Sequence, residues 1–463
     1  MKGFRHFLRK GLDNNDFIFI KPLYNKANIV IENKRRKDGH IMLIEQGSQK
    51  LREFTEASYQ EKHTKVTDGV WHISGLGHSN AVVIEGKTGV ILIDTLDSLE
   101  RGRKLLSIIR EKTGKDVGTI IYTHGHPDHR GGAGAFLESN PEVIAFATKT
   151  AALERTGLLM DIQNLRGYRQ FGYGLTDEEN ISQGIGPREG EAYGEQRAFV
   201  PPSVVYGQDQ VIREIDGVCL EMLRLPGETE DQIMVWVPEK KVLCCGDNYY
   251  GCFPNLYAVR GSQYRDLALW IKSLDVLMSY PAEYLLPGHT GVIYGNDDIK
   301  EVLGNFRRAI DYILEKTLEG MNQGRSEDQL AAEVKLPPEY AGLPYLGEYY
   351  GCVEWTVRAV YTAYLGWFDG NPTHLHPLSP KARADKKTAL MGGRTNVLKA
   401  AREACQAKEY QWCLELCDQL LDGDGDDREA ALLKADTLTS IAGYETSANG
   451  RHYYLSCAKE LRG

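Results

Sequence analysis

Three histidines and one aspartate lie within six positions of the sequence, in the segment "YTHGHPDHRGG". His124 and His126 alternate in what we expect to be an extended loop, so that both imidazoles can reach one metal ion. Asp128 and His129 are expected to point toward a second position. Neutral imidazole and carboxylate are ligands that suit zinc and other first-row divalent metals. A polar surface turn has no need of this combination, and the segment therefore predicts a metal site.

The elements around this segment must hold it at one edge of a sheet. The preceding run "GTIIYT" has the continuous apolar pattern of a strand that is buried on both faces. Such a strand delivers its following loop to the carboxyl edge of an open α/β sheet, where these sheets place their ligands. Gly131 and Gly132 are expected to let the backbone turn tightly into the helix that follows.

The longer pattern predicts two kinds of domain. "GVILIDT" and "GTIIYT" flank the helical "LERGRKLLSIIREKTG", which indicates a βαβ unit, and "QIMVWVP" and "KKVLCCGD" indicate two strands joined by a turn at 238–240. After about residue 300 the strand signals fade and helical spacing prevails. The region 161–205 is expected to be a long surface excursion that lines or covers a site. We predict a layered α/β domain followed by an all-α domain.

Composition excludes several classes of protein. The chain has 463 residues, 42% of them hydrophobic and 26% charged, with a formal net charge of −9 and mixed signs, so we expect no nucleic-acid partner. Its nine cysteines form no C-x-x-C pair, which argues against a disulfide framework and favours a reducing compartment. No apolar stretch is long enough for a membrane span, and the first residues lack the apolar core of a signal peptide. We expect a cytoplasmic protein.

The histidine segment resembles the signature of the metallo-β-lactamase superfamily, whose four-layer αβ/βα sandwich holds one or two metals. Asp94, at the end of "VILIDT", resembles the structural aspartate that orients the metal-binding loop. Asp247 in "LCCGD" matches the carboxylate that bridges the metals, and His289 in "LLPGHT" matches the late histidine on the second metal. This resemblance covers roughly residues 65–295.

One position departs from the common pattern. Where most members carry a third histidine on the first metal, this chain reads "LPGET", with Glu228 in that place. A glutamate there resembles the alkylsulfatase branch; Glu230 and Asp231 are close enough to remain candidates. The metal ligands implied by the resemblance are His124, His126, Asp128, His129, Glu228, Asp247 and His289.

The rest of the chain also resembles that branch. "YGCVEWTVRAVYTAYLGWFDGNP", "MGGRTNVLKAAREA" and "RHYYLSCAKELR" resemble its helical dimerisation domain, which implies a homodimer. The lipid-carrier-like domain of the best-known members has no counterpart in this sequence. We divide the chain into an N-terminal extension (1–64), a metallo-β-lactamase-like catalytic domain (65–300) and an all-helical dimerisation domain (301–463).

The resemblance implies a dinuclear hydrolase that uses two Zn2+ ions, or other first-row divalent metals, bridged by a hydroxide. Its expected substrate is a small anionic ester, the sulfate ester of an aliphatic alcohol, cleaved to alcohol and inorganic sulfate. Asp128, Asp247 and Arg260 are the expected catalytic residues. Arg260, in "VRG", is expected to grip the sulfate, together with Asn255 and Tyr350, since a planar guanidinium suits an oxyanion.

Two histidines that the branch uses near the sulfate are replaced, by Trp355 in "VEWTV" and by Pro254. A leaving alkoxide needs a proton or a metal, so the identity of the proton donor is open. Glu354, Tyr350 and a metal-bound water are candidates. His78 in "GLGHSN" is another, although a histidine that packs a loop is the more common case.

Three other functions compete with sulfate-ester hydrolysis. The same fold and metal pair can hydrolyse a phosphate ester, a thioester or a lactone. A di-iron redox centre with flavin also replaces histidine by glutamate, but inside the first motif, where this chain keeps His126. The third is a helical scaffold with a structural metal site, against which the full set of seven candidate ligands argues, because a structural site needs four closed ligands.

Overall fold

The computed structural model describes residues 46–150 and 153–463. Most of the predicted N-terminal extension therefore lies outside the described residues. The described residues form one compact unit. No helix in the described ranges is both long enough and apolar enough to cross a membrane.

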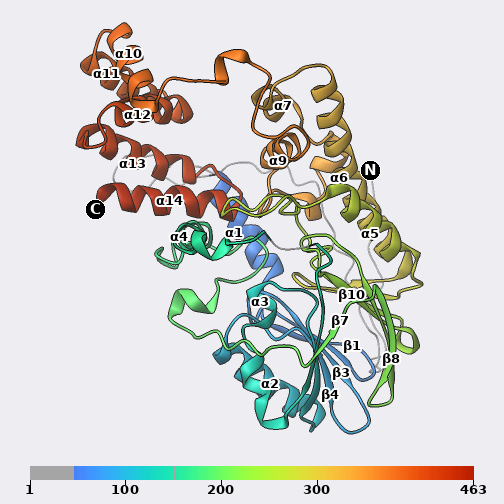
Figure 1. The fold of residues 1–463 in the computed structure, drawn as a ribbon. Coiled ribbons are helices and arrows are strands. Elements are labelled where there is room, and N and C mark those ends of the chain that lie inside the picture. The colour runs from blue at the N-terminus through green and yellow to red at the C-terminus, as the bar shows by residue number, and fades with distance from the viewer. Residues whose placement is uncertain (1–45, 151–152) are drawn as a thin grey trace, which may run out of the picture. The chain divides into compact units, whose positions relative to one another are not determined.

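Two sheets organise the first half of this unit (Figure 1). The seven-stranded sheet has the order β1-β2-β3-β4-β5-β6-β7, and the six-stranded sheet has the order β13-β12-β11-β10-β9-β8. The βαβ unit is confirmed, because β4 and β5 pair in parallel across α2. The strands are β1 (Lys62–Thr67), β2 (Val70–Ser74), β3 (Ala81–Glu85), β4 (Val90–Ile93), β5 (Val117–Ile121), β6 (Glu142–Phe146), β7 (Val204–Tyr206), β8 (Gln210–Ile215), β9 (Val218–Arg224), β10 (Ile233–Val237), β11 (Val242–Gly246), β12 (Tyr284–Pro287) and β13 (Ile293–Tyr294).

Helices follow the sheets in sequence and also cover them. Beyond residue 296 the described elements are helical, as the sequence predicts. The helices are α1 (Gln46–Ser58), α2 (Leu99–Thr113), α3 (Pro127–Arg130), α4 (Met160–Phe171), α5 (Leu267–Ser279), α6 (Asn296–Asn322), α7 (Glu327–Glu333), α8 (Pro338–Ala341), α9 (Val353–Leu365), α10 (Pro380–Leu390), α11 (Arg394–Gln406), α12 (Tyr410–Gly423), α13 (Arg428–Ala442) and α14 (Ala448–Arg462).

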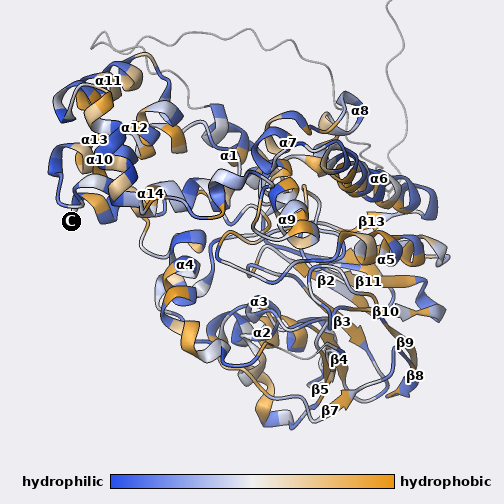
Figure 2. Cartoon of the chain, turned by 45° about the horizontal axis from the view of Figure 1, so that its top comes forward, coloured by the Kyte–Doolittle hydropathy of each residue, from blue (hydrophilic) through white to orange (hydrophobic). Residues whose placement is uncertain are grey.

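Three apolar cores separate four layers. The first lies between the sheets, where Ile91 and Val235 belong to one cluster. The second lies between the seven-stranded sheet and α2, which contributes Leu105. The third joins the six-stranded sheet to α5 and α6, through Trp270 and Leu303. Figure 2 shows the strands as largely hydrophobic, as burial on both faces requires. The predicted αβ/βα sandwich followed by an all-helical region is confirmed.

Candidate metal centre

The histidine segment forms the connection that follows β5, and its two glycines also allow a close approach that the sequence did not predict. The short helix α3 comes before Gly131 and Gly132, and a 3-10 helix, Ala133–Ser139, follows them as the sequence predicts. Both glycines have ordinary negative φ angles, −63° and −90°. Their role is close approach: a Cβ on Gly131 would lie 2.1 Å from the carbonyl oxygen of Asp97, and one on Gly132 would lie 2.1 Å from that of Thr95. The glycines therefore let the histidine segment pack against the loop that follows β4.

The structure brings all seven predicted ligands into two adjoining groups. The nitrogens His124 Nε2 and His126 Nδ1 lie 2.9 Å apart. Asp247 reaches both groups, because its oxygens lie 3.7 Å from Nε2 of His124, 3.4 Å from Nε2 of His129 and 3.3 Å from Nε2 of His289. The first group is His124, His126, Glu228 and Asp247, and the second is Asp128, His129 and His289.

Each ligand follows the carboxyl end of a strand or lies in a turn beside one. His124 comes three residues after β5, Asp247 directly follows β11, and His289 follows β12. Since β11 and β12 are parallel neighbours, their carboxyl ends meet at the same sheet edge. The site therefore lies where open α/β sheets bind ligands.

Asp94 contacts His129 of the second group and the residue that precedes His124. Its Oδ1 accepts a hydrogen bond from the Thr123 backbone amide (2.8 Å), and its Oδ2 accepts one from the Thr123 hydroxyl (2.7 Å). Oδ2 also lies 2.7 Å from Nδ1 of His129. Asp94 adopts a left-handed backbone with φ 60°, a conformation that costs free energy for a residue with a side chain and often marks functional sites.

Of the three acids in the turn after β9, the structure brings Glu228 into the cluster. Glu230 instead accepts hydrogen bonds from the backbone amide and hydroxyl of Thr150, at 2.8 and 2.7 Å. Asp231 lies behind the loop, where its carboxylate is 3.0 Å from the position of a Cβ on Gly125. The sequence left these three acids as alternatives, and the geometry favours Glu228.

Arg265 is a site residue that the sequence reasoning missed. Its guanidinium donates hydrogen bonds to the Glu228 carboxylate and to the backbone carbonyl of Asn255. Arg265 and Glu228 are each 5% exposed, so the ion pair is shielded from solvent. Burial raises the pKa of Glu228 to about 8, while Arg265 opposes that shift by favouring the carboxylate.

The remaining polar atoms of the cluster are suited to a cation. Nε2 of His129, Nε2 of His289, Oδ1 of Asp247 and Oε2 of Glu228 are buried and have no hydrogen-bond partner among the described residues. Buried polar atoms without partners cost free energy. Burial also lowers the pKa of His124 to about 3, which keeps its imidazole neutral, as ligation requires. The donor set therefore fits divalent metal ions, which would satisfy these atoms.

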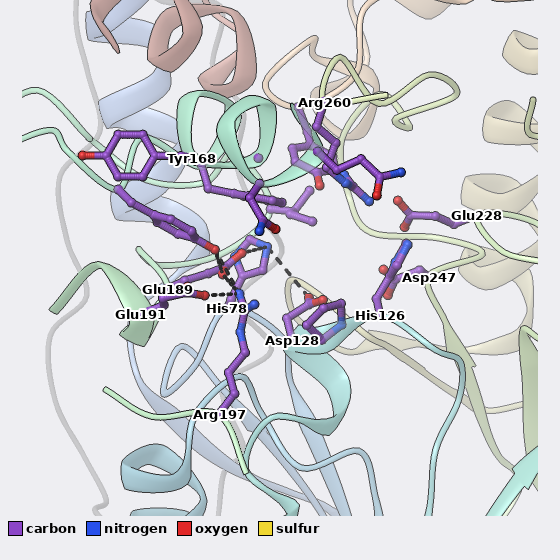
Figure 3. A pocket seen from close by; sticks show the side chains of 18 residues that line it. His78, His126, Asp128, Tyr168, Glu189, Glu191, Arg197, Glu228, Asp247 and Arg260 are labelled. Carbon is purple, nitrogen blue, oxygen red and sulfur yellow. Dashed lines mark hydrogen bonds and ion pairs between the residues drawn. The ribbon is translucent and has the colours of Figure 1, made fainter. Parts of the chain in front are cut away.

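A cavity of about 420 Å³ opens above the two groups (Figure 3). The excursion that the sequence places at 161–205 supplies one side of it, so the expectation that this region lines a site is confirmed. Four predicted ligands and Arg260 reach the cavity, and aromatic rings form much of its wall. The lining residues are His78, His126, Pro127, Asp128, Gln163, Asn164, Gly167, Tyr168, Phe171, Tyr173, Ile185, Glu189, Glu191, Arg197, Glu228, Asp247, Arg260 and Tyr350.

The predicted substrate-binding residues differ in position. Arg260 and Tyr350 both line the cavity. Asn255 is not among its lining residues, and its buried side-chain amide has no hydrogen-bond partner in the described ranges. Trp355 lines a separate cavity beside α9. Pro254 is buried against Gly351, where a Cβ would meet the proline carbonyl.

The candidate proton donors Glu354 and His78 differ in their distance from the cavity. Glu354 is half-exposed and paired with Arg358 at 3.2 Å, away from the cavity. His78 is 2% exposed and lines the cavity, with Nε2 at 3.8 Å from Asp128 and 4.0 Å from Glu189. Burial lowers the pKa of His78 to about 4. His78, which the sequence offered both as a candidate proton donor and as a loop-packing residue, therefore reaches the wall of the cavity.

Two facing sheets between helical layers, with a histidine and carboxylate cluster at the sheet edge, define the chain as a metallo-β-lactamase fold. The family model "Metallo-beta-lactamase superfamily" matches residues 74–289, and "Alkyl sulfatase dimerisation" matches residues 326–463. The chain belongs to the alkylsulfatase family of this superfamily.

Three relatives carry this assignment. A linear primary-alkylsulfatase of Pseudomonas sp. (strain ATCC 19151) is 36% identical over 82% of this chain and 74% of its own length. An alkyl/aryl-sulfatase of Saccharomyces cerevisiae is 32% identical over 86% of this chain and 63% of its own. The solved structure of a stereoselective inverting sec-alkylsulfatase from Pseudomonas sp. is similar with a TM-score of 0.80, 29% identity, and coverage of 87% of this chain and 66% of that one. The chain thus spans about two thirds of the length of these relatives.

Proposed function

We propose that the protein is a dinuclear-metal hydrolase that cleaves the sulfate ester of an aliphatic alcohol to the alcohol and inorganic sulfate. The observation that supports this most is the convergence of seven histidine and carboxylate side chains below a cavity that also contains Arg260. Membership of the alkylsulfatase family supports the choice of ester.

The two groups would each hold one divalent metal, with Asp247 shared between them. We propose two Zn2+ ions per chain, with other first-row metals able to replace them. Two such ions supply a hydroxide at neutral pH and stabilise negative charge on the ester oxygens. The proposed ligands are His124, His126 and Glu228 for the first metal, Asp128, His129 and His289 for the second, and Asp247 for both.

The side chains of the cavity would bind the two ends of the ester. The planar Arg260 guanidinium suits the sulfate, because it offers several donors in fixed geometry. Burial raises the pKa of Tyr350, so its phenol keeps its proton at neutral pH and can donate a hydrogen bond to a sulfate oxygen. Phe171 and Ile185 would pack against the aliphatic part and exclude water. The role of Asn255 in substrate binding stays a prediction.

Product analysis tests the proposal. Zinc-loaded protein is incubated with a medium-chain primary alkyl sulfate, the matched alkyl phosphate, a thioester and a lactone, and the released anions, thiol and acid are measured. Inorganic sulfate from the first substrate, lost in Asp247→Ala, is the expected result. Release of phosphate or thiol without release of sulfate would show that the substrate is another ester. Two bound metals with no turnover of any substrate would favour the scaffold function.

The finer organisation is also a proposal. The match to a dimerisation family supports a homodimer through the helical domain, which sedimentation of the full chain would test. We keep domain boundaries at 65–300 and 301–463, supported by the limits of the two family matches. All nine cysteines are unpaired, which supports a reducing, cytoplasmic location.

A further inference from the structure

The segment that carries Arg260 has little regular structure of its own. It belongs to the connection between β11, which ends at Gly246, and α5, which begins at Leu267. Connections of this kind are more mobile than the elements they join unless other groups hold them. An arginine has a long side chain with many rotamers, so the position of its guanidinium depends on what fixes the backbone and the stem.

Helix α4 holds this segment at three points. Oε1 of Gln170 accepts a hydrogen bond from the Arg260 backbone amide at 2.8 Å. The Arg260 guanidinium lies 5.6 Å from the ring centroid of Phe171, within reach of a cation–π contact. Nη2 of Arg166 donates to the carbonyl of Val259 at 2.7 Å.

The helix α4 is in turn fixed by α14, which lies beside it in Figures 1 and 2. Nδ1 of His452 lies 3.0 Å from the backbone carbonyl oxygen of Gln170, and both side chains are fully buried. Because a carbonyl can only accept, Nδ1 of His452 must carry the hydrogen. The exposed pair of Arg169 and Glu460 adds a second link, with Nε to Oε1 at 2.9 Å.

We propose that Gln170 is a positioning residue for Arg260, and that His452 positions Gln170, so that α14 of the helical domain sets the geometry of anion binding in the cavity. The inference rests on the proposed function, because it takes Arg260 to be the group that binds the sulfate. Without the Gln170 contact, the Arg260 backbone amide loses its acceptor, and Phe171 contacts only the far end of the side chain. Small misplacement of a binding group lowers affinity and rate strongly.

Substitution of Gln170 gives the first test. Gln170→Leu removes the acceptor but keeps the size of the side chain. The dissociation constant of inorganic sulfate, measured by calorimetry on zinc-loaded protein, should rise about tenfold, and the KM for the alkyl sulfate should rise more than kcat falls. Zinc content should not change, which separates positioning of Arg260 from damage to the metal site.

A matched pair at His452 gives the second test. His452→Asn places an amide N–H where Nδ1 was, whereas His452→Gln places its amide near Nε2 and loses the donor to Gln170. We expect sulfate affinity close to that of the unchanged protein in His452→Asn and weakened affinity in His452→Gln. Equal affinities in the two variants would overturn the role of His452.

The outcomes distinguish this inference from the proposed function. If Arg260→Met weakens sulfate binding but Gln170→Leu does not, the positioning role is wrong and the function stands. If Gln170→Leu weakens sulfate binding while the unchanged protein cleaves no sulfate ester, the positioning role stands and the function is wrong. If Arg260→Met leaves sulfate binding unchanged, the inference is overturned. Should Gln170→Leu fail to fold, the pair His452→Asn and His452→Gln decides by the same sulfate measurement.

Discussion

Oδ2 of Asp94 lies 2.7 Å from Nδ1 of His129, and both side chains are buried. The contact assigns the hydrogen of the ring to Nδ1, because the carboxylate can only accept. In the neutral ring, Nε2 of His129 is then the nitrogen without a hydrogen, and it faces Asp128 and Asp247, each at 3.4 Å. Asp94 therefore fixes both the tautomer and the orientation of a proposed metal ligand without lying in the cavity.

Replacement of Asp94 should weaken metal binding. In Asp94→Asn the side chain can present an N–H to Nδ1, which disfavours the tautomer that ligation needs, and we expect zinc affinity to fall by about 10- to 100-fold. Competition with a chromophoric chelator measures this. Asp216→Asn is the matched control, because Asp216 also accepts three hydrogen bonds, from Thr88 and Gly89, but lies at the surface. Equal zinc affinity in both variants would remove the role of Asp94.

Two glutamates in the same turn should behave differently. Glu228→Gln removes a charged donor from the first group, so we expect loss of about one zinc per chain, measured by plasma mass spectrometry, and loss of hydrolysis. Glu230→Gln should keep the full zinc content and the hydrolytic activity, because Glu230 contacts Thr150 instead of the ligand cluster. If Glu230→Gln loses the metal and Glu228→Gln retains it, the assignment of the third ligand is reversed.

Two arginines of one loop should separate stability from anion binding. Arg265→Met leaves the Glu228 carboxylate buried without its partner, and removal of one member of such a pair costs about 3–5 kcal/mol. Urea unfolding of the metal-free protein measures the free energy of unfolding. Arg260→Met should change that free energy little, since Arg260 is only partly buried. Similar unfolding midpoints for the two variants would contradict the importance of the Arg265 pair.

The positions of the ligands were readable from sequence because most of them follow strands. Asp94, His124, Asp247 and His289 each stand within three residues of an apolar run, and parallel strands bring such positions to one edge. The resemblance placed Glu228 in the ligand position, but Glu230 and Asp231 stayed open, because the direction of a side chain within a turn depends on backbone angles that the residue types do not specify.

Arg265 was not predicted because its partner is 37 residues away in sequence. Its neighbour Asp266 has an obvious local role, because it caps α5 by accepting hydrogen bonds from the backbone amides of Ala268 and Leu269. The sequence around Arg265 therefore gives no sign of a contact with Glu228. The close approach at Gly132 was not predicted for a related reason. The requirement for glycine comes from the carbonyl of Thr95, which approaches only when two loops pack together.

That packing gives a prediction at Gly132. A methyl group there would meet the Thr95 carbonyl oxygen at 2.1 Å, so the loops must move apart. We expect Gly132→Ala to lower the free energy of unfolding by about 1–3 kcal/mol and to lower zinc affinity as His129 shifts. Gly118→Ala is the control, because no atom lies within 4 Å of its added methyl. Equal stability of the two variants would contradict the close-approach argument.

The buried His452 predicts a pH dependence of stability. Burial lowers its pKa from 6.5 to about 3, so the unfolded chain binds the proton more tightly than the folded protein. Its contribution to stability is therefore complete above pH 6.5 and is lost as the pH falls from 6.5 toward 3. In His452→Asn the free energy of unfolding should fall less steeply in this window, by up to about 1.4 kcal/mol per pH unit. If the free energy of unfolding of the metal-free variant and that of the metal-free parent changed with pH in parallel, the folded protein would bind a proton at His452 as readily as the unfolded chain.

The contact between Gln170 and His452 joins positions 282 residues apart. During synthesis the strands and all seven proposed ligands leave the ribosome well before α14 is translated. A nascent chain can then assemble the metal-binding edge while α4 still lacks its anchor. On the proposed role of His452, loss of α14 would remove the anchor of Gln170 and leave all seven proposed ligands in the chain. Metal occupancy alone is therefore a poor measure of the amount of competent protein in a preparation.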